Sequence, residues 1–260
     1  MADLQWLSGQ SVATPIVAVA GNSLRLKVLP GAGEKLPLTI VSSTPAVANA
    51  VEVNNRMGPN FTTFILHAVL GGETSLSIRS GDRVVYGPVQ VRVQPVLTLP
   101  DQTTDAGLLA RLLLAEAPNP TLVAANAQAE IGESLRLMRV VVENRRAKPS
   151  SRWGSQGATS LADVIRAPGQ FHGLGSYPTI AGDVLANINN ILRLANEAGD
   201  QRQPVLRAHV EAVLQIARGP RPPDPTGGKL YWWRTAGSGA PSSDVTLYKT
   251  LAGNSFYQER

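Results

Sequence analysis

Short apolar or alternating runs separated by turn residues fill residues 11–96 of the chain. Alternation is clearest in SLSI (residues 75–78) and VQVRV (residues 89–93), where every second side chain is apolar. This pattern lets one face of a strand meet a core while the other face meets solvent. Six or seven such runs are typical of a β-sandwich, and they predict an N-terminal β domain over residues 1–98.

Helical periodicity begins after the segment PVLTLPDQTTDAG, which contains Pro95 and Pro100, and a domain boundary is expected there. The second domain, residues 103–260, is predicted to be mainly helical. Its expected helices, each with an apolar stripe, cover residues 105–117, 133–146, 183–198 and 204–217.

Length, charge and residue composition support two domains and exclude several classes of function. The 260 residues leave room for two domains. The net charge of +5 is spread over both halves, so no basic arm for nucleic acid is predicted. There are no cysteines, which excludes disulfides and thiolate catalysis. His67, His172 and His209 are too scattered for a metal site, so neither metal nor cofactor is expected. The Asn54-Asn55 pair is expected to form a turn.

Glu116 is the candidate for chemistry. On a helix it follows Leu112 by four residues and Leu113 by three, so it projects from the apolar face. Burial and the negative end of the helix dipole would both raise its pKa. A carboxylic acid that stays protonated can act as the general acid of glycoside cleavage. Spacing alone leaves open an alternative, a helix-end residue paired with Arg111.

Four segments follow one another in the order of a known family. LLARLLLAEA (108–117), VVVENR (140–145), SLADVIRAPGQF (160–171) and DPTGGKLYWW (224–233) resemble the AEARGE-type, AVVLNR, VI-x-x-PGQF and DPTGGALYYY motifs of the SleB-like cell-wall hydrolases. The run GGETSLSIRSGDRVVYGPVQVRVQP resembles the closing strands of bacterial immunoglobulin-like domains. The fold class expected from both resemblances is an immunoglobulin-like β-sandwich followed by a lysozyme-like α+β, mostly helical, domain.

The family resemblance implies cleavage of peptidoglycan between N-acetylmuramic acid and N-acetylglucosamine. It puts the catalytic carboxylate on Glu116. The substrate-binding residues that it implies are Asn144, Gln170, Phe171, Asp224, Tyr231 and Trp232.

The sequence departs from the family directly after Glu116, where APNP stands in place of ARGE. Glu130 or Glu133 could be the second acid, or Glu130 could itself be the catalytic group. A hydrolase needs a second carboxylate, whereas a lytic transglycosylase can use one glutamate as acid and then base. Because no second acid is placed, we expect a lytic transglycosylase. Muramidase activity by hydrolysis stays open.

The N-terminus lacks a basic start followed by an apolar run, and no segment approaches the length of a membrane span. We therefore expect synthesis in the cytoplasm without a signal peptide and non-classical delivery to the periplasm or cell wall. An antibacterial effector, as in type VI secretion, or a phage endolysin fits this expectation. The β domain would dock on a secretion-apparatus or phage component, and an immunity protein could be a further partner. A non-catalytic peptidoglycan-binding module and a structural role are the other hypotheses.

Overall fold

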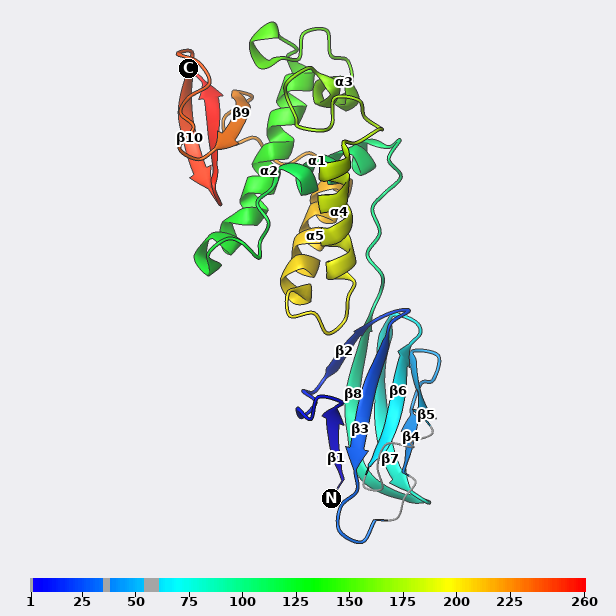
Figure 1. Ribbon diagram of the computed structural model, residues 1–260. Helices are drawn as coiled ribbons and strands as arrows, with labels where there is room; N and C mark the ends of the chain where they lie inside the picture. Colours follow the sequence, from blue (N-terminus) through cyan, green and yellow to red (C-terminus); the bar gives the residue numbers. More distant parts are fainter. Residues whose placement is uncertain (1, 35–37, 54–60) are drawn as a thin grey trace. The chain divides into compact units, whose positions relative to one another are not determined.

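The computed structural model describes residues 2–34, 38–53 and 61–260 of the chain (Figure 1). They form two compact units, Met1–Val96 with Asn196–Gln201, and Leu97–Ala195 with Arg202–Arg260. The Asn54-Asn55 pair, expected as a turn, lies outside the described residues.

Two four-stranded sheets build the first unit, with strand orders β1-β3-β6-β5 and β2-β8-β7-β4 (Figure 1). Neighbouring strands are antiparallel except β2, which runs parallel to β8. The strands are β1 (Asp3–Trp6), β2 (Ile16–Val19), β3 (Ser23–Leu29), β4 (Thr39–Ser42), β5 (Ala48–Val53), β6 (Thr62–Ala68), β7 (Gly72–Ser80) and β8 (Arg83–Gln94).

Side chains from both sheets share one core in this unit. Leu26 and Phe64 come from one sheet, and Leu76 and Val91 come from the other. The alternating runs of the sequence lie in β7 and β8, where buried and more exposed residues alternate. Period-2 patterning therefore sets which face of each strand meets the core.

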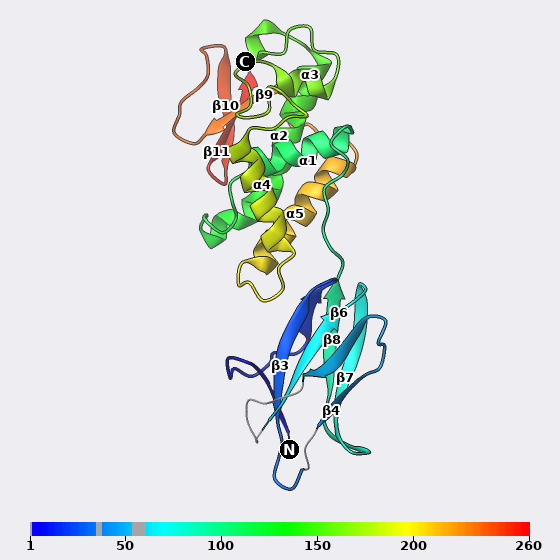
Figure 2. The same ribbon diagram turned by 45° about the vertical axis from the view of Figure 1, so that its right-hand side comes forward.

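The second unit combines five α-helices with a three-stranded antiparallel sheet of order β10-β11-β9 (Figure 2). β9 packs along α2, and α5 packs against both α1 and α4. The elements are α1 (Asp105–Glu116), α2 (Ala125–Ala147), the 3-10 turn η1 (Ser151–Trp153), α3 (Leu161–Arg166), α4 (Gly182–Ala195), α5 (Gln203–Arg218), β9 (Leu230–Thr235), β10 (Val245–Leu251) and β11 (Asn254–Glu259).

The start of α1 is fixed by its cap and by one glycine. Thr104 is the N-cap, and its side chain accepts a hydrogen bond from the amide of Gly107 at 3.0 Å. A Cβ at Gly107 would lie 1.9 Å from the carbonyl oxygen of Asp101, so only glycine fits against the incoming chain. The helix ends at Glu116, which puts the candidate acid in its last turn.

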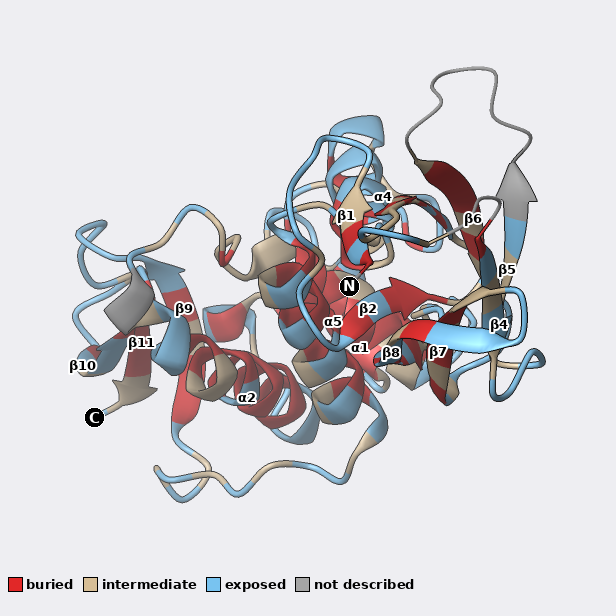
Figure 3. Cartoon of the chain, turned by 90° about the horizontal axis from the view of Figure 1, so that it is seen from below, coloured by how far each residue is buried: buried red, intermediate tan, exposed pale blue. Residues whose placement is uncertain are grey.

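Helix α2 begins at Ala125, eight residues before the predicted start. One side of the helix is buried in the unit's core, and its buried residues are coloured red in Figure 3. It carries Asn144 and Arg145 on its last turns, next to the sheet.

The predicted fold class, an immunoglobulin-like sandwich followed by a lysozyme-like and mostly helical domain, is wrong. The described residues form eleven strands in three sheets, and one of these sheets closes the half that was expected to be mainly helical. The physical reason is that β9, β10 and β11 pair only with one another, across intervening loops. Which strands pair with one another is not visible in the spacing of apolar residues, whereas the apolar face of a helix is visible within one short segment.

Candidate active site

A cleft of about 460 Å³ opens in the second unit where the end of α1, the loop after α3 and the three-stranded sheet meet. Among its lining residues, all within the described chain, Glu116 carries the only carboxylate. The lining residues are Glu116, Arg145, Gly169, Gln170, Phe171, Trp232, Trp233, Arg234, Thr235, Ser238 and Asn254.

The carboxyl group of Glu116 has a raised pKa. Burial is the largest cause, and it is opposed by a hydrogen bond from the side chain of Trp233 and by the positive charges of His172 and Arg145. The net direction favours the protonated acid over a wider pH range than for an exposed glutamate. Glu116 can therefore donate a proton and, after losing it, still has partners for its negative charge.

Arg145 is buried at 2% exposure, yet its guanidinium lines the cleft. Its Nε donates to the carbonyl oxygen of Tyr231 at 2.7 Å, and its Nη1 donates to Oε1 of Gln170 at 2.9 Å. The guanidinium carbon lies 5.2 Å from the ring centroid of Trp232. Burial lowers the pKa of Arg145 to about 10, while the nearby Glu116 charge raises it, so this group remains a cation at neutral pH.

Gln170 and Phe171 come from the loop after α3. The Gln170 side chain extends from Arg145 to Gly154. A Cβ on residue 154 would lie 2.1 Å from Nε2 of Gln170, so a larger residue at this position would collide with the amide. Phe171 packs on Trp233 with ring centroids 5.4 Å apart. Both predicted residues line the cleft, and the glycine leaves room for the amide of Gln170.

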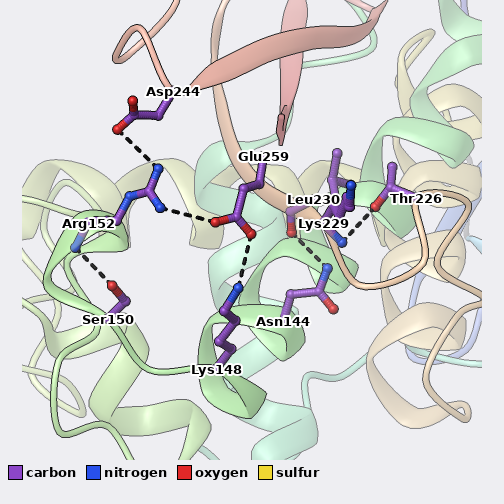
Figure 4. Close-up of polar contacts among 9 residues, drawn as sticks. All are labelled: Asn144, Lys148, Ser150, Arg152, Thr226, Lys229, Leu230, Asp244 and Glu259. Atoms are coloured by element: carbon purple, nitrogen blue, oxygen red, sulfur yellow. Dashed lines mark hydrogen bonds and ion pairs between the residues drawn. The ribbon is translucent and has the colours of Figure 1, made fainter.

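Asn144 and Asp224, predicted to bind substrate, do not line the cleft. Asn144 donates from Nδ2 to the carbonyl oxygen of Leu230 at 2.8 Å (Figure 4). It also donates to Asp224 at 2.7 Å and accepts a hydrogen bond from Arg221. Burial raises the pKa of Asp224, but hydrogen bonds from Asn144, Thr226 and the Gly228 amide outweigh burial and lower it. The two residues join α2 to the turn before β9, because their polar atoms are engaged with each other and with backbone.

A charged cluster holds the same end of the sheet, where the amide of Glu259 donates to the carbonyl oxygen of Lys229, directly before β9. Glu259 on β11 accepts from Lys148 at 3.0 Å and from Arg152 at 3.1 Å, and Arg152 also pairs with Asp244 at 3.0 Å (Figure 4). These contacts tie the segment after α2 to β11 and to the loop before β10. The sheet that carries the cleft's tryptophans is thus anchored at two places.

Tyr231 was predicted on the groove wall, but it does not line the cleft. Its ring stacks on Trp153 at 4.4 Å with an interplanar angle of 4°, and it is 3% exposed. Trp232 lines the cleft and packs edge-on against Trp153 at 6.0 Å. Tyr231 therefore contacts Trp153, and Trp153 in turn contacts Trp232 of the cleft.

The two candidates for a second acid also lie away from the cleft lining. Glu130 accepts a hydrogen bond from the amide of Ala252 at 2.8 Å, and Glu133 forms an ion pair with Lys249 at 2.8 Å. Arg111, the alternative partner of Glu116, donates instead to the carbonyl oxygen of Pro100 at 2.9 Å.

Sequence reasoning missed several cleft residues. Arg145 stands in the VVVENR segment directly after Asn144, so the motif contained it. Trp233 was not missed, because the family motif placed both tryptophans next to Tyr231 on the groove wall, and it lines the cleft; its hydrogen bond to Glu116, however, could not be read from spacing. Nothing in the local sequence singles out the remaining missed residues, Arg234, Thr235, Ser238 and Asn254.

His172 lies at the rim of this region. Its side chain is 78% exposed and pairs with Asp183 at 2.9 Å. The described residues contain no group of three histidine, aspartate or glutamate side chains placed to hold a metal ion. No described helix has both the length and the apolar character needed to cross a bilayer.

No family model and no curated protein matches the sequence. Solved structures of the S-layer protein SbsC are weakly similar. Domains 4 and 5 of that protein match with 25% identity over 31% of this chain and 47% of that one, at a TM-score of 0.26. Domains 1–6 match with 18% identity over 38% of this chain and 13% of that one, at a TM-score of 0.30. The match spans less than half of either structure, and TM-scores this low establish no family.

Proposed function

We propose that the second unit cleaves peptidoglycan glycan strands between N-acetylmuramic acid and N-acetylglucosamine as a lytic transglycosylase. The observation that carries this proposal is the lone carboxyl group of the cleft, Glu116, whose pKa is raised by burial beside aromatic and amide side chains. One such group can serve as acid and then as base.

In the first step Glu116 donates its proton to the glycosidic oxygen. The bond between C1 of the muramic acid and that oxygen breaks, and the oxygen leaves as the 4-hydroxyl of N-acetylglucosamine. The raised pKa of Glu116 keeps the acid protonated for this step. The new carboxylate is stabilised by the Trp233 hydrogen bond and by the charge of Arg145.

In the second step the carboxylate of Glu116 takes the proton from the 6-hydroxyl of the same muramic acid. The oxygen of that hydroxyl forms a bond to C1, which gives a 1,6-anhydro end and restores the acid. No water is consumed. The same side chain acts in both steps, so a second carboxylate is unnecessary.

The positions of Glu130 and Glu133 favour this route over hydrolysis. Glycosidases that hydrolyse commonly place two carboxyl groups on either side of the scissile bond, roughly 5 to 10 Å apart. Glu130 is bonded to a backbone amide and Glu133 to Lys249, and neither lines the cleft. Muramidase activity is the alternative outcome of the test below.

Sugar binding would use the aromatic and polar side chains of the cleft together. The rings of Phe171, Trp232 and Trp233 suit the C–H face of a sugar, whereas its hydroxyl and acetamido groups need polar partners. Gln170, from the loop after α3, and Asn254, from β11, are such partners. A substrate that is apolar on one face and polar at its edges fits this lining.

The decisive experiment is digestion of purified sacculi in water enriched in ¹⁸O, followed by mass spectrometry of the soluble fragments. A transglycosylase gives anhydro-muropeptides without ¹⁸O at the new end. Reducing ends that carry ¹⁸O would show a muramidase. Intact sacculi that retain the protein would show a binding module and overturn the proposal.

Delivery is a further part of the proposal. We propose that the enzyme reaches the wall as a secreted antibacterial effector or a phage lysin, with the first unit docking on the delivery apparatus. Expression in a Gram-negative host should be toxic when the protein is directed to the periplasm and harmless in the cytoplasm. Toxicity that persists in Glu116→Gln would contradict this assignment.

A further inference from the structure

A second hollow, of about 570 Å³, lies on the other side of the loop that carries Gln170. We call it the distal groove. It is lined mainly by small and polar residues, among them Ser151, Gly154, Gln156 and Gly157, and its two charged lining residues are Asp163 and Arg166.

The loop after α3 separates the distal groove from the cleft. Pro168 lines the groove, whereas Gly169 and Gln170 line the cleft. The Gln170 side chain is hydrogen-bonded to Arg145 on the cleft side and packs against Gly154 on the groove side. A single amide therefore stands at the boundary of the two hollows.

The cleft alone is small for a polymer. Sites for small molecules commonly measure roughly 300 to 1,000 Å³, so a cleft of about 460 Å³ accommodates a short saccharide. A glycan strand bound there must continue over the neighbouring surface. The distal groove has a comparable size, and its lining residue Pro168 is followed in the chain by Gly169 of the cleft lining, so the strand could continue into it.

We propose, on the basis of the proposed function, that the distal groove binds the continuation of the glycan strand, a muramyl sugar that carries its acidic stem peptide. Ser151 and the backbone at Gly157 suit sugar hydroxyl and acetamido groups, because nothing lies within 4 Å of the place that a Cβ would take at Gly157, so the ligand can approach closely. Arg166 supplies the cation for a peptide carboxylate.

The charges of the groove support this choice. Arg166 is exposed, and its Nε donates to the carbonyl oxygen of Tyr177 at 2.6 Å, which orients the guanidinium. The other charged lining residue, Asp163, is an anion whose Oδ2 accepts hydrogen bonds from Thr159 and from the amide of Ser160, which hold it in the cap of α3. The exposed cation can therefore bind a carboxylate of the ligand.

The test uses peptidoglycan strands of defined length, with stem peptides or freed of them by an amidase. Ser151→Trp fills the groove, and Gln156→Trp, at another lining position, does the same if the first variant fails to fold. We expect either variant to raise KM about tenfold for long strands and to leave a tetrasaccharide unaffected. Arg166→Gln should raise KM about fivefold, and only for peptide-bearing long strands.

Arg136→Gln, an exposed arginine of α2 that lines neither hollow, is the matched control. Unchanged KM for long strands in both tryptophan variants would overturn the inference. Equal losses by Arg166→Gln with and without peptides would overturn the role of Arg166. Equilibrium binding of the same strands to Glu116→Gln, with and without the groove substitutions, tests the groove without catalysis. A wild-type protein that cleaves nothing but loses strand binding in Ser151→Trp would refute only the proposed function.

Discussion

Arg145 donates a hydrogen bond from Nη1 to Oε1 of Gln170 at 2.9 Å, although the two residues are 25 positions apart. The same guanidinium donates to the backbone of Tyr231 on β9 at 2.7 Å. One buried side chain thus joins α2, the loop after α3 and the sheet around the cleft that Glu116 faces. This arrangement makes Arg145 a positioning residue for the acid, and its effects can be separated from those of the acid itself.

Replacing single carboxylates should identify the catalytic group. Glu116→Gln keeps the shape of the side chain and removes the acid, so glycan cleavage should fall by roughly 100- to 10,000-fold. Glu130→Gln can still accept the Ala252 amide, and Glu133→Gln loses an exposed ion pair, so both should keep wild-type activity. Rates of release of soluble muropeptides measure all three. Full activity of Glu116→Gln together with loss in Glu130→Gln would move the site to Glu130.

Substitution of Arg145 should change the pH dependence of cleavage. Its positive charge lowers the pKa of Glu116, against the larger effect of burial. A general acid is active below its pKa, so Arg145→Gln should shift the loss of activity at high pH to still higher pH, in addition to slowing the reaction. Arg145→Lys keeps the positive charge but cannot make both hydrogen bonds of the guanidinium. It should therefore slow the reaction, while the pH at which activity is lost should shift less than in Arg145→Gln. Identical pH profiles for the wild type and Arg145→Gln would contradict the role of this charge.

Stability should report the burial of Glu116 independently of activity. Its folded-state pKa lies above the unfolded value, so its contribution to stability is fully present below the unfolded pKa, about 4.3. That contribution is lost as pH rises through the folded-state pKa. The Glu116→Gln side chain cannot ionise, so the variant does not lose this stability as the pH rises. The free energy of unfolding of the variant minus that of the wild type should therefore increase from pH 4 toward neutral pH. Urea denaturation over this range measures the difference, and a constant difference would contradict burial of the carboxyl group.

Asp224 should matter for folding of the sheet rather than for sugar contact. Its carboxylate accepts hydrogen bonds from Asn144, Thr226 and Gly228. We expect Asp224→Ala to lower the free energy of unfolding by about 2 to 4 kcal/mol. Asp244→Asn removes an exposed ion pair with Arg152 and should cost only about 0 to 1 kcal/mol. A stable Asp224→Ala protein with a raised KM would instead indicate direct substrate binding.

His209 on α5 should make the protein sensitive to acid. It is 5% exposed, and burial lowers its pKa to about 4. The folded-state pKa lies below the unfolded value of about 6.5, so stability falls by up to about 1.4 kcal/mol per pH unit as the pH drops below 6.5. His209→Leu should lose this slope in urea denaturation. His172→Gln is a control of opposite sign, because the hydrogen bond that His172 donates to Asp183 raises the pKa of His172.

Local patterns predicted the parts of the fold that depend on neighbouring residues. α1, α4 and α5 cover the predicted helices with small shifts at their ends, and Glu116 lies in the last turn of α1 as expected. The sequence indicated a loop between hairpin strands at residues 237–243, but not a sheet of three strands in the order β10-β11-β9, because that order depends on pairing between β9 and β11, which are far apart in the chain. That missing sheet is also why the predicted fold class failed.

The sequence by itself determined a period-2 first half, a helix that ends in Glu116, and the segments that carry Gln170, Phe171 and Trp232. Tertiary structure decided which polar residues face the cleft. Asn144 and Asp224 satisfy each other and the backbone, whereas Arg145, next to Asn144 in the chain, faces Glu116. A motif fixes which residues are present, but a buried polar group must find its hydrogen-bonding partners in three dimensions, and only the folded chain supplies them.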